Sequence, residues 1–271
     1  MTNRDWRLMV ILLILAVFIW IQDLSWVSAA SDSLPIVAAL PLFVWLGWPW
    51  RFNSRQSSLS PVGLLLTMTG FFLGAITGST LLLALGWTSL LWSWLTVRLE
   101  AESRQSVKRL LILPIMAFPW ILLDGQMIGW WFRLSGTRVA GNLFSAFGFN
   151  VVQEGTRLLV HGVPIDVAAA CAGLNTLQSM IIAGSALAFV ILGNHRVYWF
   201  NLMFLVILSW MANTLRIIAI CWAAVMISPA FAAGFFHKWG GWLVLFLMFS
   251  LSYVIFSLQS ALLQRSKEVL V

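Results

Sequence analysis

Three residues in the second half of the chain have side chains suited to acyl-transfer chemistry. The first is Cys171, in D-V-A-A-A-C-A-G-L-N-T-L-Q (Asp166 to Gln178), where a long apolar run begins. We expect Cys171 in the first turns of a membrane helix, where backbone N–H groups carry positive partial charge and favour a thiolate. The competing interpretation is that an isolated Cys in an apolar helix is a small core residue.

Arg216 is the only basic residue inside the apolar run from Val197 to Ile227. An ionisable group within a membrane helix is costly, so it is a candidate functional residue. The 19 residues from Val197 to Arg216 rise about 28 Å, which reaches the outer edge of a hydrocarbon core about 30 Å thick. A side chain that extends to the lipid headgroups, or an ion pair with Asp166 or Glu154, is the structural alternative.

His237 lies in F-F-H-K-W-G-G, a predicted loop before the last apolar run. Imidazole is the natural proton carrier near neutral pH, although an interfacial His can also act as a headgroup anchor. His161 remains an alternative acid or base on the same predicted face, whereas His195 falls on the opposite one. Together the trio supplies what cysteine acyl transfer needs: Cys171 attacks a carbonyl, His237 protonates the leaving amine, and Arg216 stabilises the oxyanion.

The elements that position this trio are membrane helices. The chain has 271 residues, 61% of them hydrophobic and 9% charged, far from the roughly 25% charged residues of soluble domains. The apolar runs lack the alternation of barrel strands. Its net charge of +7 comes from short clusters between these runs, which indicates topology signals and no nucleic-acid partner. The two Cys and three His show no metal-binding spacing, so we expect no metal and no cofactor.

We predict an all-α polytopic membrane protein with about eight spans and a short extracytoplasmic β element. The predicted spans cover about 8–29, 34–48, 61–97 as two helices, 110–123, 171–192, 197–227 and 242–263. Three segments follow: N-terminal helices (1–123), an extracytoplasmic segment (124–170) and a catalytic membrane region (171–271). In the middle segment, 127–149 is amphipathic, and 150–167 holds β-favouring runs separated by turns.

Glycine and proline mark the breaks within the first segment. The pair of helices in 61–97 should turn near Gly78 to Thr80, and the four-residue spacing of Gly70, Gly74 and Gly78 favours close helix packing. Pro114 and Pro119 should kink or break the span at 110–123.

Charge sets the orientation. With eight spans and a cytoplasmic N-terminus, 11 of the 16 Lys and Arg face the cytoplasm, as the positive-inside rule requires. The trio then faces the other side. We therefore expect a multi-pass membrane protein with its site on the extracytoplasmic face.

Three motifs resemble those of the exosortase and archaeosortase family of membrane cysteine transpeptidases. They are C-A-G-L-N at Cys171 to Asn175, N-T-L-R-I at Asn213 to Ile217, and His237 before the last helix. Their order and spacing agree with that family over about 144–242.

The resemblance implies Cys171 as nucleophile, His237 as acid/base and Arg216 as the oxyanion-stabilising or thiolate-orienting group. It implies substrates that are exported proteins with a C-terminal sorting signal of the PEP-CTERM kind: a motif, a transmembrane helix and a basic tail. The signal would be cleaved through a thioester and the protein passed to an acceptor amine or water. The residues expected to support the trio or line the site are Asn175, Asn213, Gln178 and Asp166, with helix packing the alternative for Asn175 and Gln178.

Two other classes of function remain open from the residues. One is a multi-pass transporter, although no repeat between the halves supports it. The other is a non-catalytic assembly protein of an envelope or exopolysaccharide export system, for which Cys171 would be dispensable.

Overall fold

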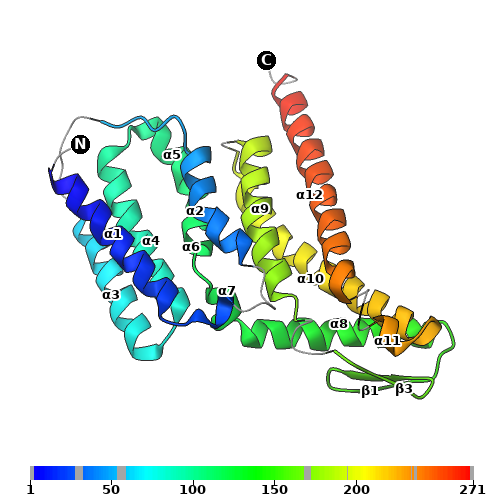
Figure 1. Ribbon diagram of the computed structural model, residues 1–271. Helices are drawn as coiled ribbons and strands as arrows, with labels where there is room; N and C mark the ends of the chain where they lie inside the picture. Colours follow the sequence, from blue (N-terminus) through cyan, green and yellow to red (C-terminus); the bar gives the residue numbers. More distant parts are fainter. Residues whose placement is uncertain are drawn as a thin grey trace. The chain divides into compact units, whose positions relative to one another are not determined.

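The computed structural model describes residues 3–27, 33–53, 59–167, 172–193, 195–232, 234 and 237–268, with the backbone alone at 3–4, 237–238 and 266–268. These residues form helices and one small antiparallel sheet (Figure 1). Four described helices are long and apolar enough to cross a membrane: Thr80–Arg98, Leu174–Leu192, Val197–Met226 and Trp239–Arg265. The protein is thus a helical multi-pass membrane protein with a β element, but the predicted eight spans are not confirmed.

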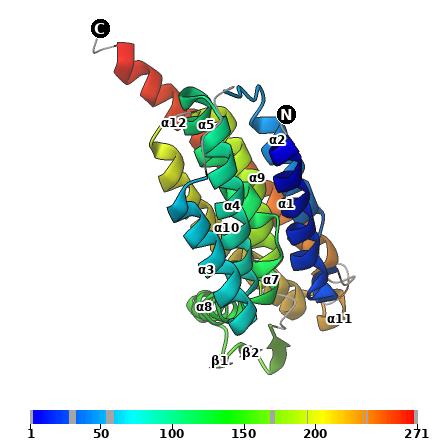
Figure 2. The ribbon, with the colours of Figure 1, turned by 90° about the vertical axis from the view of Figure 1, so that its left-hand side faces the viewer.

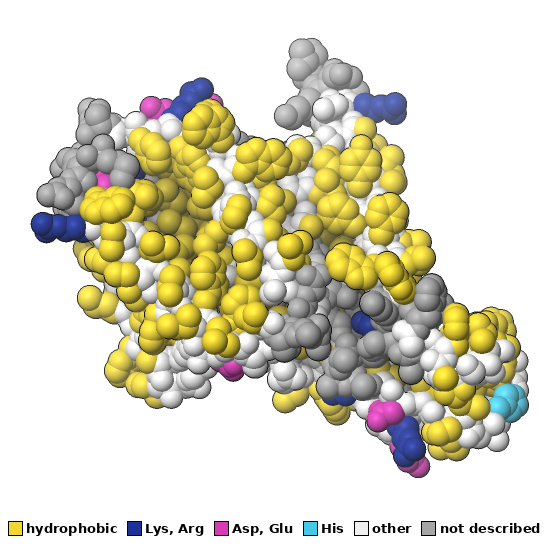
Figure 3. All heavy atoms as spheres, in the orientation of Figure 1, with side chains coloured by type: hydrophobic (Ala, Val, Ile, Leu, Met, Phe, Trp, Pro, Cys, Tyr) yellow, Lys and Arg dark blue, Asp and Glu magenta, His cyan; other side chains and the backbone are white. Residues whose placement is uncertain are grey.

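Two of the predicted spans are short. The helix α2 (Leu34–Leu46) has 13 residues and α3 (Pro61–Thr77) has 17, below the roughly 20 needed to cross a hydrocarbon core upright. Hydrophobic side chains cover much of the visible surface of the described helices, and charged side chains gather at helix ends and in connecting segments (Figure 3).

The chain divides into two compact units. The first comprises Met1–Asp124 with Ser185–Tyr198, and the second comprises Gly125–Gly184 with Trp199–Val271. The second unit contains Arg216 and the four residues expected to support the catalytic trio, which are Asn175, Asn213, Gln178 and Asp166. The predicted division at 123, 170 and 271 remains a prediction about sequence segments.

The first unit holds the N-terminal helices. In chain order these are α1 (Asn3–Ile21), η1 (Leu24–Val27), α2, α3, α4 (Thr80–Arg98), α5 (Ala101–Leu110), α6 (Ile112–Met116) and α7 (Trp120–Leu123). Arg98 at the end of α4 forms an ion pair with Asp5 of α1, and both side chains are largely buried. This pair joins the first and fourth helices at one end.

The turn between α3 and α4 confirms the expected break. Gly78 ends α3 with φ +69°, the left-handed conformation that glycine adopts without steric cost. Asp124 stabilises the start of α4 by accepting hydrogen bonds from Ser79 Oγ at 3.0 Å and the Leu81 N–H at 2.8 Å.

The close helix packing predicted for the glycines is confirmed at Gly70 and Gly74. A Cβ atom added to Gly70 would lie 2.8 Å from Gly86 Cα, and one added to Gly74 would lie 2.8 Å from the Leu83 side chain. Gly78 has open space around it, so its role is the turn and not packing.

The proline-containing span is broken as expected, at Leu111 before α6 and at Pro119 before α7. Pro119 stands between α6 and α7 with a non-helical backbone. Pro114 lies within the first turn of α6, where the missing N–H has no intrahelical partner to lose.

The second unit contains α8 (Gln126–Ala146), the three strands, most of α10 (Val197–Met226), α11 (Pro229–Phe231) and α12 (His237–Glu268). The first part of α9 (Leu174–Leu192), up to Gly184, also belongs to it. The helix α8 runs crosswise to α12, since it appears along its length in Figure 1 and end-on in Figure 2. A helix over Gln126–Ala146 agrees with the predicted amphipathic segment at 127–149.

The sheet confirms the predicted strands and turns. It consists of β1 (Val151–Glu154), β2 (Arg157–Val160) and β3 (Val163–Asp166), paired antiparallel in the order β1-β2-β3. Gly155 and Gly162, in the two connecting turns, have positive φ angles. Leu158, Val160 and Ile165 of the sheet pack with Phe144 of α8 in one buried cluster.

Candidate active site

The helix α10 organises the second unit because three of its faces contact three other helices. It has 30 residues, so it is about 45 Å long, compared with about 30 Å for a hydrocarbon core. In its last turns, Ile217, Cys221 and Ala224 join the buried cluster formed by the sheet and α8.

The first face of α10 meets α9 and the residues that precede it. A Cβ atom on Gly184 of α9 would lie 2.4 Å from Leu205 Cδ2. Two turns further along α10, Asn213 occupies the space beside Gly173: a Cβ there would lie 2.7 Å from Asn213 Cγ. Gly173 also has φ +74°, so both its backbone and its neighbour exclude a side chain.

Asn213 is 1% exposed, and within the described chain neither its Oδ1 nor its Nδ2 has a hydrogen-bond partner. Leaving a buried polar group unpaired costs about 1–3 kcal/mol. The Oγ1 of Thr214, the next residue, is buried and unpaired in the same sense. Of these two groups, the Asn213 amide lies against Gly173, whereas Thr214 Oγ1 faces Gly136 of α8.

The second face of α10 meets the beginning of α12. The guanidinium of Arg216 lies against Gly241, whose added Cβ would be 3.6 Å from Arg216 Cζ and 3.7 Å from its Nε. Arg216 is partly exposed, while its Nε is buried. Gly241 follows His237 by four residues, one turn of α12. The structure therefore brings Arg216 to the first turns of the helix that begins at His237.

The third face of α10 packs on α8. Trp210 Nε1 donates a hydrogen bond to Ser135 Oγ at 2.8 Å, and a Cβ on Gly136 would lie 2.8 Å from Ile217 Cδ1. At the other end of α8, Gly129 lies against Leu174, the first residue of α9. The crosswise helix α8 thus supports both α10 beside Arg216 and the start of α9.

Two of the predicted catalytic residues are described only in part. The predicted helix start at Cys171 is corrected to Leu174, because Ala172 and Gly173 are not helical, and Cys171 itself lies outside the described residues. His237 was expected in a loop before a helix starting at Trp242, but α12 begins at His237. Its side chain is not among those described.

The predicted supporting residues fall in different places. Asn213 lies beside Gly173, as described above. Gln178 is 2% exposed and Asn175 is partly exposed; they share a face of α9, but that face does not extend as a helix to Cys171. Asp166 is exposed at the end of β3, opposite Arg157 of β2.

The alternative that Arg216 forms a structural ion pair with Asp166 or Glu154 is wrong. The ion pairs found in the described part of the chain are Arg51–Glu102 and Arg98–Asp5. Arg216 does have a polar or electrostatic interaction, but neither of these two carboxylates provides it.

His161 lies in the turn between β2 and β3. It is exposed, has φ +48°, and its ring contacts Phe149 edge-on at 5.1 Å between centroids. These contacts belong to the sheet, so nothing in the described site favours His161 over His237.

Sequence reasoning missed two contributions. Arg133 of α8 donates from Nη1 to the carbonyl oxygen of Val167 at 3.3 Å and so fixes the end of the sheet. Gly241 accommodates the Arg216 guanidinium, and its helical spacing from His237 in H-K-W-G-G is the signal that could have identified it.

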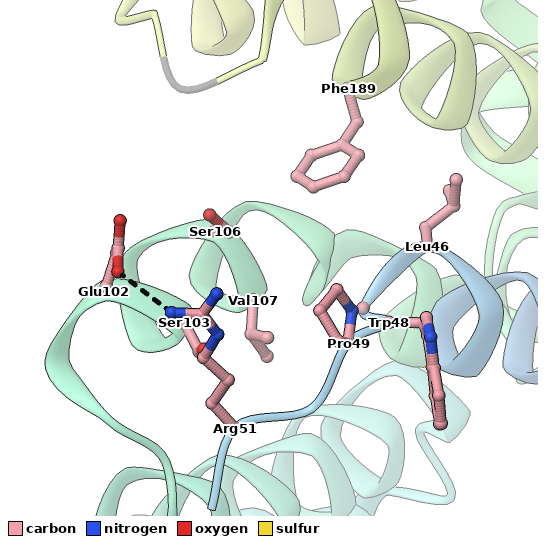
Figure 4. Close-up of a pocket in the computed structure, with 10 residues that line it drawn as sticks. Leu46, Trp48, Pro49, Arg51, Glu102, Ser103, Ser106, Val107 and Phe189 are labelled. Carbon is pink, nitrogen blue, oxygen red and sulfur yellow. Dashed lines mark ion pairs between the residues drawn. The ribbon is translucent and has the colours of Figure 1, made fainter.

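A pocket in the first unit is a poor alternative site. It has a volume of about 320 Å³ and is lined by Trp48, Pro49, Ser106 and Phe189, with the ion pair between Arg51 and Glu102 at its edge (Figure 4). The pair is 3.7 Å long and strongly exposed, which makes it worth at most about 1 kcal/mol. Neither a thiol nor an imidazole lines this pocket.

The fold and the site define a helical multi-pass membrane protein with a buried amide and a partly exposed guanidinium on successive turns of one long helix. Comparison with protein families matches residues 8–254 to transmembrane exosortase. The chain therefore belongs to the transmembrane exosortase family. Comparisons with curated proteins and with solved structures gave no match.

Proposed function

We propose that this protein is a membrane-embedded cysteine transpeptidase that cleaves C-terminal sorting signals of exported proteins. Its substrates carry a short PEP-CTERM-like motif, a transmembrane helix and a basic tail. The protein acts in the bacterial cytoplasmic membrane with its site on the extracytoplasmic face. The family match over residues 8–254 supports this function.

The observation that carries the proposal is the convergence on α10. Asn213 contacts Gly173, and Arg216 contacts Gly241. Gly173 follows Cys171 by two residues in the sequence, and two residues of chain span at most about 7 Å. Gly241 is one helical turn from His237. The segments in which the nucleophile and the acid/base occur thus approach α10 at residues three positions apart, which are neighbours on the surface of a helix.

In the proposed reaction the Cys171 thiolate adds to the scissile carbonyl carbon, and the carbonyl oxygen takes the electron pair. His237 protonates the leaving nitrogen as the tetrahedral intermediate collapses to a thioester, and Arg216 orients the thiolate or stabilises the oxyanion. An acceptor amine or water then displaces the thiolate. A substrate held by its own membrane helix is presented at fixed depth, which raises its effective concentration.

The test is processing of a co-expressed exported protein with the tripartite C-terminus. We expect Cys171→Ala, Arg216→Ala and His237→Ala each to abolish cleavage at normal protein abundance, because each removes one required group. Immunoblotting of the substrate's size measures the outcome.

Cys221→Ala is the matched control, since Cys221 is fully buried in the cluster of α8 and the sheet and should leave cleavage intact. Normal processing by the Cys171→Ala variant would sink the proposal and favour an assembly role.

A further inference from the structure

We propose that Asn213 is the oxyanion donor of this site: its side-chain amide N–H donates a hydrogen bond to the scissile carbonyl oxygen as that oxygen becomes negative. This inference rests on the proposed transpeptidase function and deepens it. It gives the oxyanion to Asn213 and leaves Arg216 with the task of holding the thiolate.

The first argument is the burial of an amide without a partner. Asn213 is 1% exposed and both polar atoms of its side chain lack a hydrogen-bond partner within the described chain. A buried polar group of this kind calls for an explanation such as a bound ligand or a catalytic role. A substrate carbonyl would accept the hydrogen bond that the folded protein leaves unmade.

The second argument is position. Cγ and Oδ1 of the carboxamide lie 2.7 and 2.8 Å from where a Cβ on Gly173 would stand, and a half-turn about the Cβ–Cγ bond exchanges the positions of Oδ1 and Nδ2. A glycine with a positive φ at this point lets the carboxamide approach the backbone of Gly173. An oxyanion donor must sit close to the chain that carries the nucleophile, because it contacts the carbonyl under attack.

The third argument is a comparison within the same helix. Asn201 of α10 is also about 2% exposed, but its Nδ2 donates to Gln259 Oε1 at 2.8 Å. The helix thus contains one buried asparagine with a helix-packing partner and one whose amide has none among the described residues. Of these two asparagines, Asn213 is the one that lies beside Gly173.

Asn213 and Arg216 should play different roles because the amide of Asn213 is neutral and the guanidinium of Arg216 is positively charged. A neutral amide binds a developing oxyanion without attracting the thiolate in the free enzyme, so its effect is concentrated in the transition state. A guanidinium stabilises both anions. Removing Asn213 should therefore affect acyl transfer alone, whereas removing Arg216 should also affect the reactivity of the thiol.

The experiment uses the full-length protein in detergent with Asn213→Ala and Asn213→Leu. One assay measures turnover of the tripartite substrate, and a second measures the alkylation rate of Cys171 by iodoacetamide in a Cys221→Ala background. Alkylation displaces iodide from carbon and forms no oxyanion, so it reports the thiolate alone.

We expect kcat to fall about 100- to 1,000-fold, as for the loss of one oxyanion donor. The KM and the alkylation rate should stay within about twofold of the parent protein. Asn213→Leu should keep or raise the melting temperature, because it removes an unpaired polar group at similar volume.

Asn201→Leu is the matched control. It leaves Gln259 without its partner, so it should lower the melting temperature while kcat is retained. Parallel losses of turnover and alkylation in the Asn213 variants, or unchanged turnover, overturn the proposal. A failure of the transpeptidase proposal itself would show separately. The Cys171→Ala variant, with Asn213 unchanged, would then continue to process the substrate.

Discussion

At the scale of single residues, the site depends on two glycines, which have no side chain, as much as on the polar residues beside them. Gly173 and Gly241 each leave room for one polar group of α10: the carboxamide of Asn213 and the guanidinium of Arg216. A buried amide and a cation in a membrane protein need such defined space, because neither can be moved to water when a neighbour grows.

Substitutions at Gly241 should show this dependence in graded form. Gly241→Ala places a Cβ at 3.6 Å from Arg216 Cζ, an ordinary contact, so processing should stay within about twofold. Gly241→Leu extends further and displaces the guanidinium; a misplacement of about 1 Å can cost about 100-fold in rate. Turnover of the tripartite substrate measures both variants.

Trp242→Leu serves as the control for a change of side chain in the same turn, because Trp242 is 59% exposed. Equal activity of Gly241→Leu and the parent protein would show that the position of Arg216 does not matter.

At the scale of elements, the turns and the interruptions of helices follow from local residue types and were predictable. The turn at Gly78, the break at Pro119 and the strands around Gly155 and Gly162 agree with prediction because each depends on one or two residues with restricted or unusual backbone preferences. The start of α9 was predicted three residues early. Ala172 and Gly173 are compatible with an apolar helix by composition, and only the contact with Asn213 shows why the helix starts later.

The polar residues of the candidate site were predictable from the sequence, but their contacts were not. Arg216 and Asn213 could be selected from the sequence because polar residues in an apolar run are costly. The contact of Gly173 with Asn213 and that of Gly241 with Arg216 join residues 40 and 25 positions apart in the sequence. Such contacts depend on how α9 and α12 pack on α10, which periodicity does not specify.

The hairpin of α3 and α4 gives a prediction about stability. Gly70→Val should lower the apparent melting temperature in detergent, because a Cβ at 2.8 Å from Gly86 Cα meets backbone and forces the two helices apart. Overpacking of this kind costs about 1–3 kcal/mol. Static light scattering during heating measures the change.

Leu66→Val on the same helix is the control, since Leu66 is 58% exposed and should leave the melting temperature nearly unchanged. An equal melting temperature for Gly70→Val and the parent protein would contradict the close packing of these helices.

At the scale of the whole molecule, α10 is longer than a membrane is thick. With 30 residues it rises about 45 Å, and its last turns pack with the sheet and α8. The simplest arrangement has its first two thirds in lipid and its end in the extracytoplasmic segment. This arrangement depends on the orientation derived from the positive-inside rule.

Single cysteines on α10 test both depth and orientation. In a Cys171→Ala, Cys221→Ala background, a membrane-impermeant maleimide added to intact spheroplasts should label Met226→Cys and leave Met203→Cys unlabelled. Both side chains are exposed on the protein, at 50% and 69%, so lipid alone should separate them. Labelling is read by mass shift on a gel.

Detergent-solubilised protein is the control, since both cysteines should then react. Labelling of Met226→Cys only after the inner face has been opened would reverse the orientation and place the site in the cytoplasm.

The order of the helices along the chain also has a consequence for biosynthesis. Asn213 and Arg216 belong to α10, which the ribosome completes before α12. Until residues 237–241 follow, Arg216 has no Gly241 beside it and the segment with His237 does not yet exist. A nascent chain that has inserted α9 and α10 therefore lacks part of the candidate site, and under the proposed function we expect cleavage to begin only after α12 has been made.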